Sequence, residues 1–284
     1  MKVAVTGANG QLGTDVCAEF RAAGHEVQEI THGMMDLSNA DTTRELLVNS
    51  TPDVVVNTAA MHHVERCEAD PASAFAVNAL GARNLARLSN EIGFVLAHIS
   101  TDYVFDGATH RPYTEHDTPH PLNVYGNSKL AGEHFVRSIA PRHFVMRSSA
   151  LFGHAPCRAK GGLNFPQLML KLARERGTVR VVNSEVVSPT YTVDLARALL
   201  NLVGTTQYGL YHAVSTNACS WFDFAAYVFE LTATAATLQV AGADEFPAKV
   251  PRPAYSALDN LRLAKAGYVM PTWKDALERY LLPR

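Results

Sequence analysis

The sequence predicts an α/β protein with a doubly wound parallel sheet of the Rossmann type and a smaller C-terminal lobe that binds the substrate. Two observations lead to this prediction. Short runs rich in Val, Ile and Phe alternate with longer amphipathic stretches over residues 1–150, and a glycine-rich turn follows the first run. The short runs are expected to be buried parallel strands at residues 2–6, 26–30, 53–57, 94–100 and 143–148. The longer stretches are expected to be helices at residues 11–23, 39–49, 72–92 and 123–139.

The alternation ends near residue 150, after which glycines and prolines separate shorter elements. A helix and a strand expected between residues 193 and 214 would return to the sheet. We therefore predict a dinucleotide-binding domain of residues 1–150, joined by 189–215. Residues 151–188 and 216–284 would form the substrate-binding lobe over the carboxyl ends of the strands, where open α/β sheets bind ligands.

Composition excludes several classes of protein. The chain has 284 residues, a formal net charge of −2 and 47% hydrophobic residues, which suits a large buried core. The near-neutral charge gives no reason to expect a nucleic-acid or anionic-membrane partner, and no apolar run reaches the roughly 18–20 residues of a membrane span. The cysteines lack CxxC spacing and no signal peptide is apparent, so a reduced, cytoplasmic protein is expected. The twelve histidines show no ligand spacing such as HExxH, so no metal site is predicted.

A glycine-rich turn lies between the first predicted strand and the first helix, which is the context of a dinucleotide site. Gly7 permits a tight turn, Gly10 lets the backbone approach a pyrophosphate, and Gly13 allows the helix to pack closely on the strand. The phosphates would lie on the amides at the start of the helix, where Gln11 and Leu12 stand. Glycines alone are weak evidence, since turns are rich in them.

The cofactor preference is read from the end of the second strand, where NAD-specific folds carry an acid for the ribose hydroxyls. The residues here are Thr31 and His32, and Glu29 is expected to point elsewhere because side chains alternate along a strand. A 2′-phosphate is then not repelled, but no arginine is present to clamp it. The cofactor is NADP(H) or NAD(H), with a mild preference for NADP(H). Ala59 and Ala60, after the third strand, let the backbone pass close to a flat cofactor, although a tightly packed turn is the alternative.

Tyr125 and Lys129 are the candidate acid–base pair, because a spacing of four places both on one face of a helix. A nearby ammonium favours the phenolate and is expected to lower the pKa of Tyr125, which would make the phenol usable nearer neutral pH. The spacing alone also occurs by chance on exposed helix faces. Thr101 strengthens the interpretation, because it ends the fourth strand at the same sheet edge and its hydroxyl can hydrogen-bond a substrate carbonyl.

The glycine turn, Thr101 and Tyr-x-x-x-Lys together resemble the extended short-chain dehydrogenase/reductase superfamily. Within it, three segments resemble the dTDP-4-dehydrorhamnose reductase family: residues 100–107, 188–196 and 252–259. The resemblance runs through nearly the whole chain and implies NAD(P)H-dependent reduction of the 4-keto group of a nucleotide-linked deoxysugar. It implies that Thr101 polarises the keto oxygen, that Tyr125 protonates the developing alkoxide, and that Lys129 holds the nicotinamide ribose and tunes Tyr125.

The same resemblance implies further binding residues. Asp36 and Leu37 would border the adenine, and Ala59 and Ala60 the middle of the cofactor. Substrate contacts are expected at His62, Thr101, Asp102, Tyr103, Ala150, Asn164 and Arg252. Arg252 is a candidate diphosphate contact because a guanidinium fork matches phosphate oxygens, with a surface ion pair as an equal alternative.

Two segments depart from the family pattern at the sugar pocket. The family's fifth strand runs into a tryptophan that lines the pocket, where this chain has Ala150. A Tyr-Thr pair after the two alanines is replaced by Met61 and His62. Loss of an indole removes a large stacking surface, so the pocket is expected to be wider or filled from elsewhere. The resemblance therefore defines the reaction type more closely than the sugar.

Alternative functions stay open. Sugar 4,6-dehydratases resemble this chain but carry a glutamate where it has Tyr103, which favours reduction over elimination. A non-catalytic NAD(P)-binding regulatory subunit resembling that of S-adenosylmethionine synthetase is a second alternative, against which the intact Thr101, Tyr125 and Lys129 argue. A reductase or epimerase of another activated sugar is a third. The expected partner is a nucleotide-sugar substrate, and a homodimer is left open.

Overall fold

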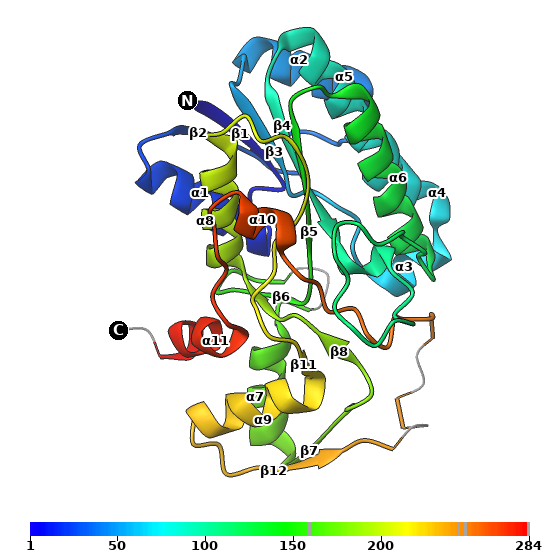
Figure 1. Ribbon diagram of the computed structural model, residues 1–284, viewed down its shortest axis with the longest axis vertical. Coiled ribbons are helices and arrows are strands. Elements are labelled where there is room, and N and C mark those ends of the chain that lie inside the picture. The colour runs from blue at the N-terminus through cyan, green and yellow to red at the C-terminus, as the bar shows by residue number, and fades with distance from the viewer. Residues whose placement is uncertain (158–160, 243–244, 247–248, 283–284) are drawn as a thin grey trace.

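The centre of the protein is a six-stranded sheet in which every pair of neighbouring strands is parallel. The computed structural model describes residues 1–157, 161–242, 245–246 and 249–282. The strand order is β10-β5-β4-β3-β1-β2. The strands are β1 Lys2–Thr6, β2 Glu26–Ile30, β3 Val54–Asn57, β4 Val95–Thr101, β5 His143–Ser148 and β10 Gly209–His212. This topology, with helices on both faces (Figure 1), confirms the predicted doubly wound fold.

The inner strands are buried on both faces because their side chains alternate between two cores, whereas in the edge strand β2 only Ile30 is buried. Val3 and Val5 of β1 belong to the core covered by α1 and α8, whereas Ala4 belongs to the core covered by α2, α5 and α6. The helices are α1 Gln11–Ala22, α2 Ala40–Ser50, α5 Ala82–Ile92, α6 Val124–Ile139 and α8 Thr192–Val203. The two helix layers lie on opposite sides of the sheet in Figure 1.

The helix predicted over residues 72–92 is interrupted. It begins as α4 (Pro71–Phe75), widens into the π-helical turn η1 (Ala76–Gly81) and continues as α5. Within η1, the side chain of Asn78 accepts a hydrogen bond from the backbone N–H of Met61 at 2.9 Å. Its Nδ2 donates to the Met61 carbonyl at 2.9 Å and to Ser128 Oγ at 3.0 Å. The π turn therefore connects the segment after β3 to α6.

The remaining elements lie outside the six-stranded sheet and its main helices, and some of them form a third core. They are α3 Val64–Ala69, η2 Asp102–Val104, β6 Leu151–Phe152, α7 Phe165–Arg176, β7 Thr178–Val181, β8 Val186–Val187, β9 Thr190–Tyr191, β11 Cys219–Ser220, α9 Trp221–Leu231, β12 Thr237–Val240, α10 Leu261–Lys265 and α11 Trp273–Leu281. Of these, α7, β7, α9, β12 and α11 gather below the sheet in Figure 1. Phe152, Phe224 and Trp273 are buried together there. None of the helices in the described part of the chain has the length and apolar character to cross a membrane.

Candidate active site

The glycine-rich turn brings the ends of β1 and β3 together. Gly7 has a φ of +71°, and a Cβ there would lie 2.9 Å from the backbone nitrogen of Ala59. Both the left-handed conformation and the close approach therefore favour glycine. A Cβ on Gly13 would lie 2.2 Å from the Gly7 carbonyl oxygen, so α1 packs directly on the turn.

The N-terminus of α1 is free of side-chain caps among the described residues, and its first turn holds no acid. Gly10 precedes the helix, Leu12 is buried in the core, and Gln11 directs its amide toward the carbonyl oxygens of Gly153 and Ala155, at 3.5 and 3.4 Å. The backbone amides and the dipole of a helix N-terminus both favour an anion. This end of α1 therefore fits the diphosphate of a dinucleotide.

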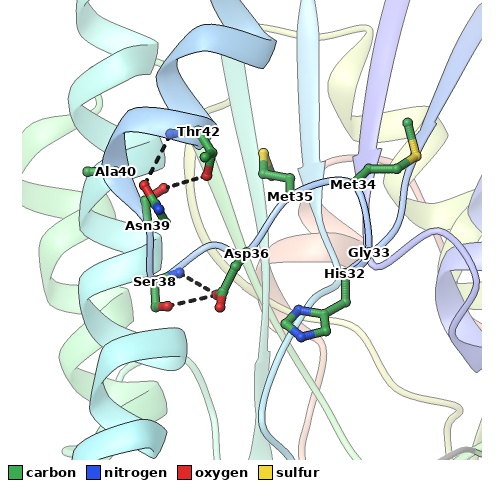
Figure 2. A pocket seen from close by; sticks show the side chains of 9 residues that line it. All are labelled: His32, Gly33, Met34, Met35, Asp36, Ser38, Asn39, Ala40 and Thr42. Carbon is green, nitrogen blue, oxygen red and sulfur yellow. Dashed lines mark hydrogen bonds between the residues drawn. The ribbon is translucent and has the colours of Figure 1, made fainter.

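A pocket of about 620 Å³ lies between β2 and α2 (Figure 2). It is lined by His32, Gly33, Met34, Met35, Asp36, Ser38, Asn39, Ala40 and Thr42. Asp36 accepts hydrogen bonds from the backbone N–H and the hydroxyl of Ser38, at 2.9 and 2.8 Å, and these bonds hold the pKa of its carboxyl below the usual range. His32 is exposed, and Figure 2 shows its side chain on the same side of the loop as Asp36. The lining, as far as the structure describes it, contains neither lysine nor arginine.

Four other predicted cofactor residues lie around this part of the sheet edge. Thr31 follows β2 and is half-buried, and Leu37 is buried against η1, where a Cβ on Gly81 would lie 2.9 Å from the Leu37 Cβ. Ala59 and Ala60 are half-buried directly after β3. Ala59 adjoins the glycine turn, whereas Leu37 contributes to the core.

The first turn of α6 places Tyr125 next to the end of β4. The Asn123 side chain caps this helix by accepting a hydrogen bond from the Gly126 N–H at 2.9 Å. A Cβ on Gly126 would lie 2.2 Å from the Tyr103 carbonyl oxygen, so the helix start is packed against the segment after β4. The rings of Tyr103 and Tyr125 meet edge to face, with 5.6 Å between their centroids. The Thr101 side chain lies close enough to the Tyr125 phenol to act on its pKa, so the structure brings these two predicted residues together.

The expectation that Lys129 lowers the pKa of Tyr125 is wrong for this structure. Burial raises the pKa of Tyr125 above its usual value, and the nearby Thr101 side chain offsets only part of this effect. Lys129 Nζ instead donates to the Ile99 carbonyl at 2.7 Å and lies 3.4 Å from His98 Nε2. The ammonium is therefore anchored to β4, and burial lowers its own pKa to about 8.

Asp102 ties three segments together beneath Tyr103. Its buried carboxylate accepts hydrogen bonds from Thr101 Oγ1 at 3.1 Å, Ser149 Oγ at 2.8 Å and Ser256 Oγ at 2.6 Å. Burial raises the pKa of this carboxyl, although the three hydroxyls act in the opposite direction. Asp102, predicted as a substrate contact, thus has an internal role in joining the ends of β4 and β5 to the segment around residue 256.

The other predicted substrate residues are dispersed. His62 is exposed after β3, and Ala150 is half-buried after β5 with a φ of 44°. Asn164 caps α7 and donates to the Gly153 carbonyl at 2.7 Å and to Tyr280 Oη at 2.9 Å. Its buried amide is therefore committed to packing between α7 and α11.

Arg252 forms an ion pair with Glu65 of α3, which is the alternative that the sequence left open beside a diphosphate contact. The pair joins a loop of the C-terminal half of the chain to the N-terminal half. Burial raises the pKa of Tyr103, and the charge of the nearby Arg252 guanidinium acts in the opposite direction. Arg252 therefore stands next to Tyr103, where the rings of Tyr103 and Tyr125 meet.

Comparison with known proteins decides the family. A family model described as "RmlD substrate binding domain" matches residues 1–283. The chain belongs to the RmlD substrate binding domain family. A protein of Mycolicibacterium smegmatis named dTDP-4-dehydrorhamnose reductase is 38% identical over 282 residues, covering 98% of this chain and 84% of that protein. A Bacillus subtilis protein named "Spore coat polysaccharide biosynthesis protein SpsK" is 39% identical over 283 residues, covering 100% and 98%.

Solved structures agree with this assignment to the RmlD substrate binding domain family. The crystal structure of dTDP-4-dehydrorhamnose reductase from Bacillus anthracis in complex with NADP matches with a TM-score of 0.94 and 35% identity, covering 100% of this chain and 99% of that chain. The resemblance predicted from the sequence is therefore confirmed.

The structure of this RmlD-family chain adds buried polar residues that the sequence analysis missed. Glu133 and Arg147 form a fully buried ion pair between α6 and β5, and Asn57 and His98 lie behind Lys129. For Asn57, His98 and Arg147 the available signal was a polar residue inside a mostly apolar strand, which needs a partner when it is buried.

Proposed function

We propose that this chain catalyses the NAD(P)H-dependent reduction of the 4-keto group of a nucleotide-linked deoxysugar, as the names of its relatives indicate. The observation that carries the proposal is the contact between Tyr125 and Thr101 at the carboxyl edge of the sheet that carries the glycine turn. Relatives over nearly the whole chain are named dTDP-4-dehydrorhamnose reductase, and one from Streptomyces niveus is named dTDP-4-keto-6-deoxy-D-glucose reductase at 34% identity.

Tyr125 is the proton donor in this proposal. Its raised pKa keeps the phenol protonated at neutral pH, which is the form needed to give a proton to a carbonyl oxygen that gains negative charge. The Thr101 hydroxyl donates to Asp102 in this structure. In the proposal it turns this hydrogen to the substrate oxygen, where it stabilises the charge as it develops. The bound nicotinamide supplies the hydride.

Lys129 acts on the cofactor side of Tyr125. Its amino group is held by the Ile99 carbonyl, and with a pKa of about 8 it is mostly charged at neutral pH. We propose that it holds the nicotinamide ribose and that its charge favours the phenolate left after proton transfer.

The cofactor is proposed to lie along the carboxyl edge of the sheet. The amides of α1 would hold its diphosphate, and the pocket between β2 and α2 its adenosine. Asp36 in this pocket is engaged by Ser38, and the position after β2 is Thr31 instead of an acid. These two features favour NADP(H) and leave NAD(H) usable.

Residues 1–150 with 189–215 are proposed as the cofactor domain, and 151–188 with 216–284 as the substrate lobe. In this arrangement Arg252 would exchange Glu65 for the substrate's diphosphate, because both ligands offer a pair of oxygens to its guanidinium. We also propose a cytoplasmic location, which free thiols at Cys17, Cys67, Cys157 and Cys219 support.

The test is a spectrophotometric assay of NADPH and NADH oxidation with a panel of nucleotide-linked 4-keto-6-deoxysugars. Turnover is expected with at least one dTDP-linked substrate, and faster with NADPH than with NADH. Lack of turnover with every substrate, together with tight binding to a partner protein, would instead support the non-catalytic regulatory subunit.

A further inference from the structure

A row of buried polar side chains crosses the centre of the sheet behind Lys129. Thr6, Asn57 and His98 are aligned in register on β1, β3 and β4, so their side chains project from the same face. Thr6 Oγ1 lies 2.7 Å from Asn57 Oδ1, and Asn57 Nδ2 lies 3.0 Å from His98 Nδ1. His98 Nε2 then lies 3.4 Å from Lys129 Nζ, and all four residues are almost completely buried.

The numbers of hydrogen-bond donors and acceptors in this row limit where its hydrogens can lie. A neutral imidazole has one donor and one acceptor nitrogen, and a charged lysine has donors only. Burial and the Lys129 charge both hold the pKa of His98 well below its usual value, so the ring is neutral. Next to a charged Lys129, Nε2 must therefore accept and Nδ1 must carry the hydrogen.

Asn57 completes the constraint. The nitrogen and oxygen of an amide are assigned from their hydrogen-bond partners. If the Asn57 oxygen faces His98 Nδ1, it accepts that hydrogen, and the amide nitrogen is left for the Thr6 hydroxyl. If the amide nitrogen faces Nδ1, as the structure places it, the hydrogen moves to Nε2, and Lys129 can be accommodated there only as a neutral amine. A charged Lys129 therefore requires the amide oxygen and nitrogen of Asn57 to exchange places. The charge on Lys129 and the hydrogen position on His98 are thus coupled.

We propose that His98 is a positioning residue for the reduction: its Nε2 accepts a hydrogen bond from Lys129, holds the amino group at the end of β4 and favours its charged form. This inference rests on the proposed function, because it concerns the lysine that acts with Tyr125. His98 does not touch the reacting atoms, so its effect is expected in the pH dependence of turnover.

Three other ionisable groups act on Lys129 or on Tyr125. Glu133, one turn along α6, favours the charged form of Lys129, but its carboxylate is already paired with Arg147 of β5. Asp102 and Cys67 act on Tyr125. His98 is therefore the side chain whose loss most directly removes a hydrogen-bond acceptor from the Lys129 ammonium.

Two substitutions separate the contact with Lys129 from packing. An asparagine amide reaches the position of Nδ1 and leaves nothing at Nε2, whereas a glutamine reaches the position of Nε2. In His98→Asn we expect the basic limb of the kcat profile to shift to lower pH by about one unit, a tenfold loss of proton affinity, because the ammonium loses an acceptor. His98→Gln should retain the parent profile, and the KM for the substrate should change little in either variant.

The proposal would be overturned if the parent and a folded His98→Asn protein had equal kcat–pH profiles. It would also be overturned if both variants lost turnover equally, because His98 would then act through packing alone. A measurement on the unmodified protein covers the case in which neither variant folds. Nitrogen-15 NMR of labelled histidine reports the tautomer, and a neutral His98 with its hydrogen on Nδ1 near neutral pH is expected. A hydrogen fixed on Nε2 would refute the contact. If the parent reduces no 4-keto sugar, the proposed function fails, whereas the tautomer result still tests the contact.

Discussion

The buried pair of Glu133 and Arg147 gives a prediction about stability. The side chains are 0% and 1% exposed, and three hydrogen bonds join them: Arg147 Nη2 to Oε2 at 2.7 Å, Nε to Oε1 at 2.9 Å and Nε to Oε2 at 3.2 Å. Ser100 Oγ also donates to Oε1 at 2.5 Å. Glu133→Gln keeps the size of the side chain but leaves the guanidinium charge buried without a counter-charge.

The expected loss is large because an uncompensated buried charge costs about 3–5 kcal/mol. With an unfolding entropy of about 2.1 cal/mol/K per residue, the 284 residues give roughly 0.6 kcal/mol/K. The melting temperature of Glu133→Gln should therefore fall by about 5–8 °C. Thermal denaturation followed by circular dichroism measures this shift.

The matched control removes both charges. A double variant, Glu133→Leu with Arg147→Met, fills the same space with apolar side chains and should recover most of the lost stability, because it leaves no charge unpaired. The reasoning is refuted if the single variant melts within about 2 °C of the parent, or if the double variant is as unstable as the single one.

Three further predictions concern the turn, a buried histidine and the proposed acid. Gly13→Ala should weaken NADPH binding at least tenfold, as measured by titration, because its Cβ would lie 2.2 Å from the Gly7 carbonyl oxygen. The control is Gly204→Ala, whose Cβ would lie 3.7 Å from its nearest neighbour. Equal losses of NADPH affinity in the two variants would contradict this explanation. His212 has its pKa lowered to about 3 by burial, so the unfolded chain binds the extra proton between pH 6.5 and 3 and stability falls as the pH falls. Between pH 7 and pH 5 this group should lower the free energy of unfolding of the parent by about 2 kcal/mol. Urea denaturation should show a smaller decrease for His212→Asn, and an identical pH dependence of the unfolding free energy in both proteins would exclude His212 as the cause. Tyr125→Phe should lower kcat by about 10²–10⁴ with NADPH affinity retained, and unchanged turnover would remove Tyr125 from its proposed role.

Local sequence patterns predicted the strands well. The segments expected at 2–6, 26–30 and 143–148 have the bounds of β1, β2 and β5. Each is a short segment that contains β-branched or aromatic residues, so much of the information that defines it is local. Glu29 also points away from the predicted cofactor pocket, since it pairs with Arg21 of α1 at 2.7 Å.

Long-range partners were not predictable in the same way. Residues 65–70 include Glu65, Arg66, Glu68 and Asp70, a pattern that is typical of a solvated face. In the structure, Glu68 accepts a hydrogen bond from the Val124 N–H at 3.0 Å, and Asp70 caps α4 through the Ser73 N–H at 3.1 Å. Because Val124 is more than fifty residues away along the chain, no local pattern around Glu68 indicates that contact.

The hydrogen-bond partners of the Lys129 amino group at the candidate site were not predictable either. Helical spacing correctly places it on the face of α6 that carries Tyr125, but the spacing contains no information about which acceptors the amino group will find. The Ile99 carbonyl and His98 belong to β4, and their competition for the ammonium follows only from the packing of α6 on the sheet.

The number of residues in the π-helical turn η1 determines how α4 is oriented relative to α5. A π turn is an α-helix with one residue inserted, and each residue of an α-helix advances the chain by about 100° around the axis. Deleting one residue from Ala76–Gly81 would rotate α4 and everything attached to it by about a quarter of a revolution relative to α5. Asn78 would then leave Met61 and Ser128. Substitutions here alter individual contacts, whereas a change in residue number redirects a whole segment of the backbone.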